Sequence, residues 1–183
     1  IFFLIGCSSS EEKIFTGTDF SSDISLYKEA YNELKSGNFE RSSELFTELD
    51  LMHPYSQWAA KGQLMSGFAL YQANKYEEAI FVLNKFINSN PSAKSLDYAL
   101  YLKGYCYYER MNEVSRDQVI SKKAIETFNE LKNKYPSSKY SIKAHNHIKL
   151  LNNQLAGYEM NVGKFYQSRN KFLAAILRYK TVL

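Results

Sequence analysis

Aromatic and apolar positions in this chain recur at helical spacings. Tyr98, Tyr101, Tyr105 and Tyr108 follow one another by three, four and three residues, so all four lie on one face of a helix. Three prolines and eight glycines in 183 residues are too few for a many-turned β protein. We predict an all-α protein with helices near 24–36 and 39–52, 56–73 and 76–89, 95–111 and 116–135, and 138–168 and 171–183.

A rhythm of small residues and prolines supports this pairing of helices. Two antiparallel helices cross closely only where side chains are small, and a proline ends the second helix of a pair. In the third pair the interval between the small residues is 20 instead of 12, and the eight extra residues fall in a polar stretch at 111–119. The four copies are Ala30, Ser42 and Pro54; Gly67, Ala79 and Pro91; Gly104, Ala124 and Pro136; and Gly163 and Ala175.

The rhythm resembles that of the tetratricopeptide repeat, which implies a right-handed superhelical solenoid over residues 23–183. The interval from Pro136 to Gly163 is 27 residues where earlier repeats use 13, so we expect one long helix from about Ser138 to Ser168. The sequence stops within the pattern, at Leu183. We therefore expect about four repeats, with a further C-terminal repeat missing from the sequence.

Composition and charge add two features. Fifteen tyrosines and 12 phenylalanines against one tryptophan suggest extended half-buried surfaces, where a ring packs and its hydroxyl stays wet. The net charge of +4 is unevenly distributed. Up to Pro91 there are 7 Lys and Arg against 12 Asp and Glu, and from Ser92 there are 16 against 7. This split indicates either solvated helix faces or a basic C-terminal half that meets an acidic protein or anionic lipid.

The first ten residues, IFFLIGCSSS, have the order of a lipoprotein processing site. Residues 1–6 are too short to span a bilayer and fit the end of a signal peptide, while Leu4-Ile5-Gly6-Cys7 resembles a bacterial lipobox. We expect lipid on Cys7, a flexible tether over residues 7–22, and membrane anchoring through the acyl chains. Ser8 after the cysteine implies sorting to the outer membrane. Such a secretion signal disfavours a nucleic-acid partner.

Candidate chemistry is sparse. His145 and His147 are two residues apart, so on a helix they diverge and make a poor metal pair. We find no nucleophile–base motif, phosphate-binding glycine loop or Cys/His cluster in the sequence. Cys106 remains without a partner once Cys7 carries lipid, and is expected to be a small buried residue. We predict a binding protein without catalytic residues, metal or cofactor other than the covalent lipid.

Two stretches carry a more specific resemblance. Arg116-Asp117-Gln118 and the run LAGYEMNVGKFYQSRNKFLAAILRYKTV, residues 155–182, resemble the BamD (ComL) family of outer-membrane assembly lipoproteins in its alphaproteobacterial form. The resemblance implies a lipid-anchored scaffold on the periplasmic face of the outer membrane. Its implied partners are the POTRA domains of a BamA-type protein, other Bam lipoproteins and unfolded outer-membrane proteins. Arg178 stands where the family has a BamA-contacting arginine, and Lys171 and Lys180 are its basic neighbours.

A second candidate site is a groove lined by first helices of the repeats. In tetratricopeptide folds this helix face lines the concave side, where it could hold an extended peptide ending in an aromatic residue. The alternative for each ring is packing between helices. We expect groove exposure for Tyr27, Tyr31, Phe68, Tyr71 and Tyr101.

Two other functions stay open from the sequence. Another periplasmic repeat lipoprotein, acting in envelope division or peptidoglycan maintenance, is the nearest alternative. An anchored hydrolase would need a catalytic constellation beyond this sequence.

Overall fold

The computed structural model describes residues 22–113 and 118–182, and within them every regular element is an α-helix. The predicted signal remnant 1–6, nearly all of the tether 7–22, and Cys7 lie outside these residues. The same holds for residues 114–117 of the polar insertion, which include Arg116 and Asp117. The eight helices of the described part are α1 (Asp23–Lys35), α2 (Phe39–Met52), α3 (Ala59–Gln72), α4 (Tyr76–Ser89), α5 (Leu96–Glu113), α6 (Gln118–Lys134), α7 (Lys139–Gln167) and α8 (Phe172–Lys180).

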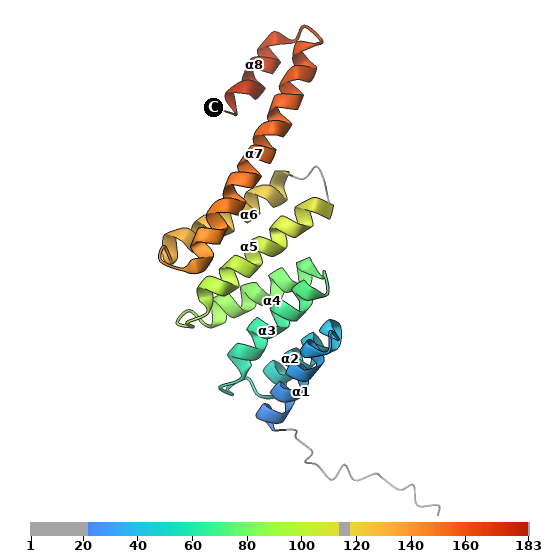
Figure 1. Ribbon diagram of the computed structural model, residues 1–183, viewed down its shortest axis with the longest axis vertical. Helices are drawn as coiled ribbons and strands as arrows, with labels where there is room; N and C mark the ends of the chain where they lie inside the picture. The colour runs from blue at the N-terminus through green and yellow to red at the C-terminus, as the bar shows by residue number, and fades with distance from the viewer. Residues whose placement is uncertain (1–21, 114–117, 183) are drawn as a thin grey trace, which may run out of the picture.

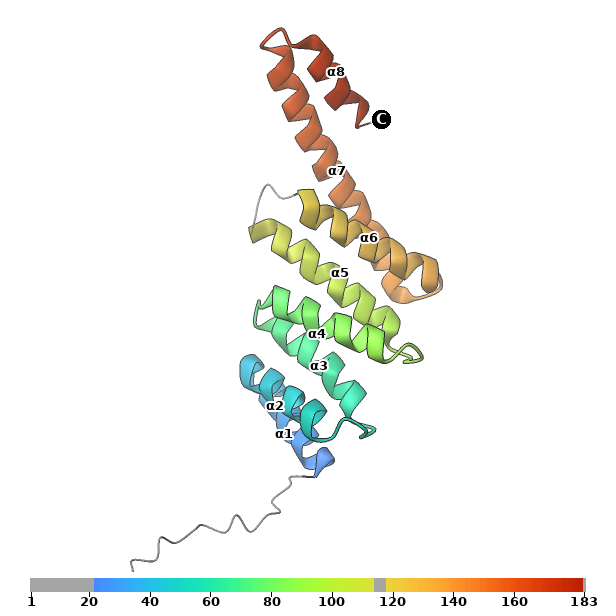
Figure 2. The same ribbon diagram turned by 180° about the vertical axis from the view of Figure 1, so that it is seen from behind.

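The helices form four antiparallel hairpins that stack in chain order into an elongated solenoid (Figures 1 and 2). The all-α repeat fold and the four predicted helix pairs are confirmed, with ends that shift by up to three residues. The start of α3 and the end of α8 each shift by three residues, and α3 begins at Ala59 instead of 56. There the Ser56 hydroxyl donates to Asp23 (2.5 Å) and accepts from the Trp58 amide (3.0 Å), which holds the preceding residues in a turn.

Small residues lie where the two helices of a hairpin cross. Ala30 and Ser42 are fully buried, and the Ser42 hydroxyl donates to the Ala30 carbonyl at 2.8 Å. A Cβ added at Gly67 would lie 2.8 Å from the Leu83 side chain. The predicted role of the small residues is therefore confirmed: a larger side chain at these positions would force the paired helices apart.

Three hairpins share one turn geometry. The first helix ends in a Schellman motif, in which a residue with positive φ follows the helix and the next amide bonds back to a carbonyl of the last turn. Glycine and asparagine tolerate this left-handed conformation, which explains their presence there. The positive φ values are 83° at Gly37, 60° at Asn74 and 57° at Asn170, followed by bonds from Asn38 to Glu33, Lys75 to Leu70 and Lys171 to Tyr166.

The expected long helix is α7, with 29 residues. Ser138 caps its start by accepting from the Tyr140 amide at 3.1 Å. The first half packs on the third hairpin through the buried Ala144 and Leu151, and the second half extends beyond α6 to pair with α8 (Figure 1). Even so, none of the helices in the described ranges is both long and apolar enough to cross a bilayer.

Candidate functional site

The first helices of the hairpins, α1, α3, α5 and α7, adjoin along one side of the stack, which we name the first-helix face. An aromatic band crosses this face from α3 to α7. Tyr71 on α3 meets Tyr105 edge-on with ring centroids 5.7 Å apart, and Tyr105 stacks on Tyr101 and Tyr108 at 5.9 and 5.7 Å. Tyr101 in turn reaches Tyr140 of α7 at 5.3 Å. These half-buried rings form one continuous surface across three hairpins.

His147 on α7 lies at the centre of this band. Its ring is within 5.0–6.0 Å of four aromatic rings, and its Nε2 atom is 3.3 Å from the Tyr101 hydroxyl. Burial lowers the pKa of His147, against a smaller opposing effect from the carboxylate of Glu109. The imidazole is therefore neutral near pH 7, and its buried Nδ1 has no hydrogen-bond partner among the described residues.

His145, two residues earlier on α7, is solvent-exposed and does not share this environment. In the described part of the chain, no three His, Cys, Asp or Glu side chains are grouped to hold a metal ion.

Tyr71, Tyr101 and Tyr105 of the band, and Tyr98 beside it, are neutral at any physiological pH because their pKa values are raised. Burial raises the pKa of Tyr98 to about 12 and also raises the pKa of Tyr71 and Tyr101. For Tyr105, burial and then the Glu109 carboxylate raise the pKa further. A neutral phenol both donates and accepts hydrogen bonds, so the band can pair with amide or carboxylate groups. Cys106, directly behind it, is fully buried as expected, and burial raises the pKa of its thiol to about 12.

The predicted groove residues divide between this surface and the core. Tyr31 is exposed, and Phe68, Tyr71 and Tyr101 are half-buried on the first-helix face. The expected groove exposure of Tyr27 is wrong, because only 7% of this residue is exposed. Its ring packs 4.7 Å from Trp58 and 5.5 Å from Phe46, and Lys61 lies over its outer face at 5.0 Å. Spacing alone did not reveal that Trp58 covers this position.

The second candidate region is the α7–α8 end of the stack. Arg178 donates to Glu159 of α7 at 3.2 Å, and Gln118 of α6 donates to the other Glu159 oxygen at 2.9 Å. The hydrogen bond from Gln118, followed by the pairing with Arg178, holds the pKa of Glu159 below its usual range despite burial. Arg178 keeps 45% of its side chain exposed while it joins α8 to α7.

The other two basic residues do not join Arg178 in one cluster. Lys171 caps α8 at its start, and Lys180 lies two residues after Arg178, about 200° around the helix axis. Both are exposed.

The sequence interpretation missed a large apolar surface at this end. Leu173 is 81% exposed and Leu177 is 68% exposed, one turn apart on α8. Phe172 and Ile176 are further exposed apolar side chains on α8, and Tyr158, Met160 and Phe165 are exposed elsewhere on α7. The signal was present as six consecutive apolar residues at 172–177, too many for the single buried face of a surface helix. Exposed apolar surface of this extent is typical of a protein contact.

Comparisons with known proteins identify close relatives of this chain. The family profile YfiO, described as "Outer membrane lipoprotein", matches residues 21–183. "Outer membrane protein assembly factor BamD" of Caulobacter vibrioides is 38% identical over 158 residues, covering 86% of this chain and 52% of the relative. The protein of the same name from Rickettsia prowazekii is 33% identical over 179 residues, covering 97% and 70%. The chain thus spans about half the length of the Caulobacter relative.

Solved structures support the fold. A double mutant of MamA superposes with a TM-score of 0.52 at 16% sequence identity, covering 90% of this chain and 75% of that one. MamA from Desulfovibrio magneticus, residues 41 to its end, gives a TM-score of 0.51 at the same identity, covering 89% and 75%. At this identity the likeness concerns architecture alone.

Proposed function

The chain belongs to the YfiO family of outer membrane lipoproteins, and from that premise we propose that it is a lipid-anchored scaffold of the outer-membrane β-barrel assembly machinery. In this role it binds the POTRA region of a BamA-type protein and joins other Bam lipoproteins. It also receives unfolded outer-membrane proteins. The repeat fold suits such a role, because stacked hairpins present long surfaces to several partners at once.

The α7–α8 end carries this proposal. Leu173 and Leu177 expose apolar side chains on the same helix as Arg178, whose side chain is 45% exposed. An apolar centre with an arginine beside it has the composition of a protein interface hot spot. The basic C-terminal half adds long-range attraction to an acidic partner surface. We propose that the BamA-type partner contacts Arg178, Lys171 and Lys180 around this apolar centre.

The test is a binding assay between the purified chain and the periplasmic POTRA region of the BamA-type protein from the same organism. We expect Leu173→Asp to weaken binding at least tenfold, because the aspartate places a charge in the apolar centre. Leu173 is almost fully exposed, so this variant keeps its fold. Ile142→Asp is the matched control, since Ile142 is 70% exposed at the opposite end of α7. Equal affinities for both variants would refute the proposed interface.

Charge reversal of the arginine gives a second test. The Arg178→Glu variant places a second carboxylate beside Glu159, which also loosens the contact between α8 and α7. We therefore pair it with Arg178→Gln, which removes the charge but retains hydrogen-bond donors. Lys28→Glu, on the exposed surface of α1, controls for net charge. We expect weaker POTRA binding for both Arg178 variants and none of this loss for Lys28→Glu. Wild-type affinity in Arg178→Gln would remove this residue from the proposal.

We assign the receptor role to the aromatic band. With Tyr31 and Phe68 beside it, the band presents ring faces on the first-helix face, and Tyr71 and Tyr101 add neutral hydroxyls. An extended peptide that ends in an aromatic residue would stack on these rings, while the hydroxyls bond its backbone. Anchoring through Cys7 would keep this face near the periplasmic surface of the outer membrane.

A role in envelope division or peptidoglycan maintenance remains the alternative. The relatives named as assembly factors favour the first function. The same binding assay distinguishes the two, because only the assembly scaffold requires POTRA affinity.

A further inference from the structure

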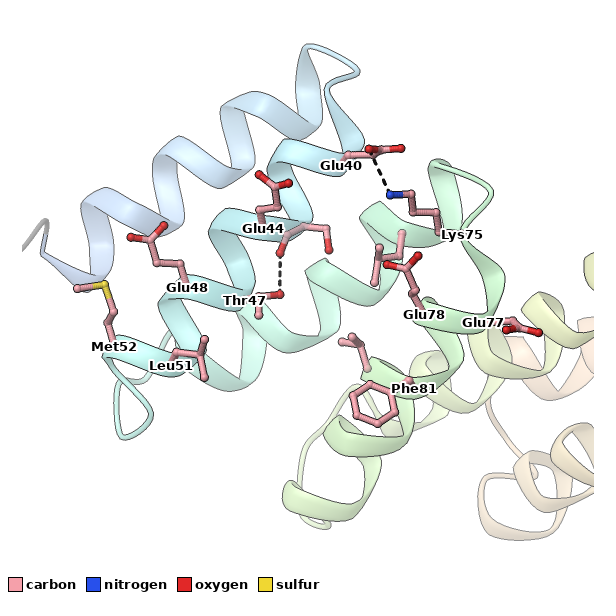
Figure 3. A pocket seen from close by; sticks show the side chains of 13 residues that line it. Glu40, Glu44, Thr47, Glu48, Leu51, Met52, Lys75, Glu77, Glu78 and Phe81 are labelled. Carbon is pink, nitrogen blue, oxygen red and sulfur yellow. Dashed lines mark hydrogen bonds and ion pairs between the residues drawn. The ribbon is translucent and has the colours of Figure 1, made fainter.

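A groove lies on the side of the stack opposite the aromatic band, between the second helices of the first two hairpins. Helices α2 and α4 form its walls, and Leu70 of α3 reaches its floor. The groove has a volume of about 730 Å³. Figure 3 shows Glu44 and Glu48 along α2 on one side, and Glu78 with Phe81 on α4 on the other.

Two ion pairs join the walls. Lys75, at the start of α4, pairs with Glu40 in the first turn of α2 at 3.2 Å (Figure 3). Further along, Lys85 of α4 pairs with Asp50 of α2 at 2.5 Å. Each wall is a helix of 14 residues, so the groove is preformed over about 20 Å.

The inside of the groove is apolar and open to solvent. Phe81 is 73% exposed, Leu51 is 72% exposed and Met52 is 44% exposed. These three side chains come from both walls and lie among the lining residues of one groove. Packing within the described chain does not require Phe81 or Leu51, because little of either side chain is buried. Exposed phenylalanine, leucine and methionine gathered in a groove are typical of a protein contact.

The rim is acidic. The lining residues include five glutamates and one lysine, a net charge of −4. Part of this charge has a local role: Glu40, Glu77 and Glu78 lie in the first turns of their helices, where a carboxylate offsets the helix dipole. Glu44 pairs with Arg41 at 3.1 Å. Glu48 and Glu78 are exposed and form no ion pair with any residue that the structure describes.

We propose that this groove docks a basic amphipathic segment of a partner protein, with apolar side chains against Phe81 and Leu51 and lysines or arginines against Glu48 and Glu78. This inference goes beyond the proposed function and does not rest on it. The acidic rim repels anionic lipid and nucleic acid, which leaves a cationic protein segment as the complementary occupant. A second copy of this chain would have to bind head to tail through its basic C-terminal half, and such a contact builds rings or open filaments instead of a simple dimer.

The first experiment measures fluorescence anisotropy of a labelled peptide of lysine, leucine and alanine, about 14 residues long, with leucines on one helix face. A second peptide replaces every lysine by glutamate. We expect the purified chain to bind the lysine peptide with an affinity that falls as salt rises, and not the glutamate peptide. Equal binding of both peptides, or no binding of the lysine peptide, would overturn the proposal.

Matched variants locate the binding. Glu48→Lys combined with Glu78→Lys is compared with Glu29→Lys combined with Glu126→Lys, which makes the same change of net charge on exposed positions outside the groove. We expect at least tenfold weaker binding for the groove pair only. Equal loss in the two pairs would show that bulk charge explains the affinity and would reject the groove.

The apolar contact is tested in the same way. Phe81→Ala is compared with Ile142→Ala, since both side chains are exposed by 70% or more and neither change opens a core cavity. We expect about tenfold weaker binding for Phe81→Ala alone. Wild-type affinity in Phe81→Ala would overturn the proposed apolar contact.

The nature of the partner is tested in cells. A photoreactive residue at position 81 of the full chain, followed by mapping of the crosslinked peptide, is expected to return a lysine- or arginine-rich segment of another protein. A neutral or acidic segment, a segment of this chain itself, or no crosslink would each refute the proposed occupant. Sedimentation of the purified chain provides the matching check: self-association that Phe81→Ala abolishes would identify a second copy instead.

Discussion

The close crossing of α5 and α6 can be tested by adding a single methyl group. A Cβ at Gly104 would lie 2.6 Å from Cε1 and 2.7 Å from Cδ1 of the Phe128 ring, which is fully buried. Real Cβ atoms do not approach carbon atoms this closely, so Gly104→Ala must displace the ring or separate the helices. Gly157 is the matched control, because it lies within α7 and a Cβ there meets nothing within 4 Å.

The two substitutions should act in opposite directions. Replacing glycine by alanine within a helix stabilises it by up to ~1 kcal/mol. At Gly157 this gain stands alone, so we expect Gly157→Ala to raise the free energy of unfolding by up to ~1 kcal/mol. At Gly104 overpacking costs about 1–3 kcal/mol against this gain, and we expect a net loss of up to about 2 kcal/mol. For a chain of this size, each 1 kcal/mol corresponds to about 2–4 °C in melting temperature.

The assay is urea denaturation followed by helical circular dichroism, with thermal melting as a second measurement. The expected result is a gap of about 1–3 kcal/mol between two variants of identical chemistry, equal to the overpacking cost at Gly104. If Gly104→Ala were as stable as Gly157→Ala, helix propensity would dominate at both positions. The close approach of α5 to α6, and with it the reason for the small-residue rhythm, would then be refuted.

Three further predictions concern the other regions. Burial lowers the pKa of His147 from its ordinary 6.5, so below pH 6.5 the folded chain binds fewer protons than the unfolded chain and loses stability. The urea midpoints measured at pH 8 and at pH 5.5 should therefore differ less in His147→Gln than in the control His145→Gln. Tyr71→Ala should weaken, about tenfold, the binding of a peptide with a C-terminal phenylalanine measured by anisotropy, whereas Tyr55→Ala, a fully exposed ring in the α2–α3 loop, should not. Cys7→Ser in the full-length protein should move it from the membrane pellet to the soluble fraction; continued pelleting without its partners would contradict the lipid anchor.

The sequence predicted the hairpins because each hairpin is determined by residues that lie close together in the chain. A helix crossing requires small residues on both helices, and the turn that joins them requires a residue that accepts positive φ. Gly67 with Ala79, and Asn74 between them, therefore mark one hairpin within 13 residues of sequence. The long helix α7 was also predictable, because no proline interrupts the sequence between Pro136 and its end.

The binding surfaces were less predictable because they depend on neighbours distant in sequence. Tyr27 has the same helical spacing as Tyr31, yet Trp58 from the next hairpin buries only the first of them. The sequence marked Arg178 as a partner-contacting residue but did not indicate that it pairs with Glu159, 19 residues earlier. The α2–α4 groove arises from two helices separated by a third, and no periodicity in either helix indicates the space between them.

The continuity of α7 has a mechanical consequence. One uninterrupted helix of about 43 Å serves as the partner of α6 at one end and of α8 at the other, with no flexible joint between the two contacts. Force applied at α8 is therefore delivered along a stiff rod to the residues around His147. The continuous helix α7 therefore couples the orientation of the α7–α8 end to that of the aromatic band.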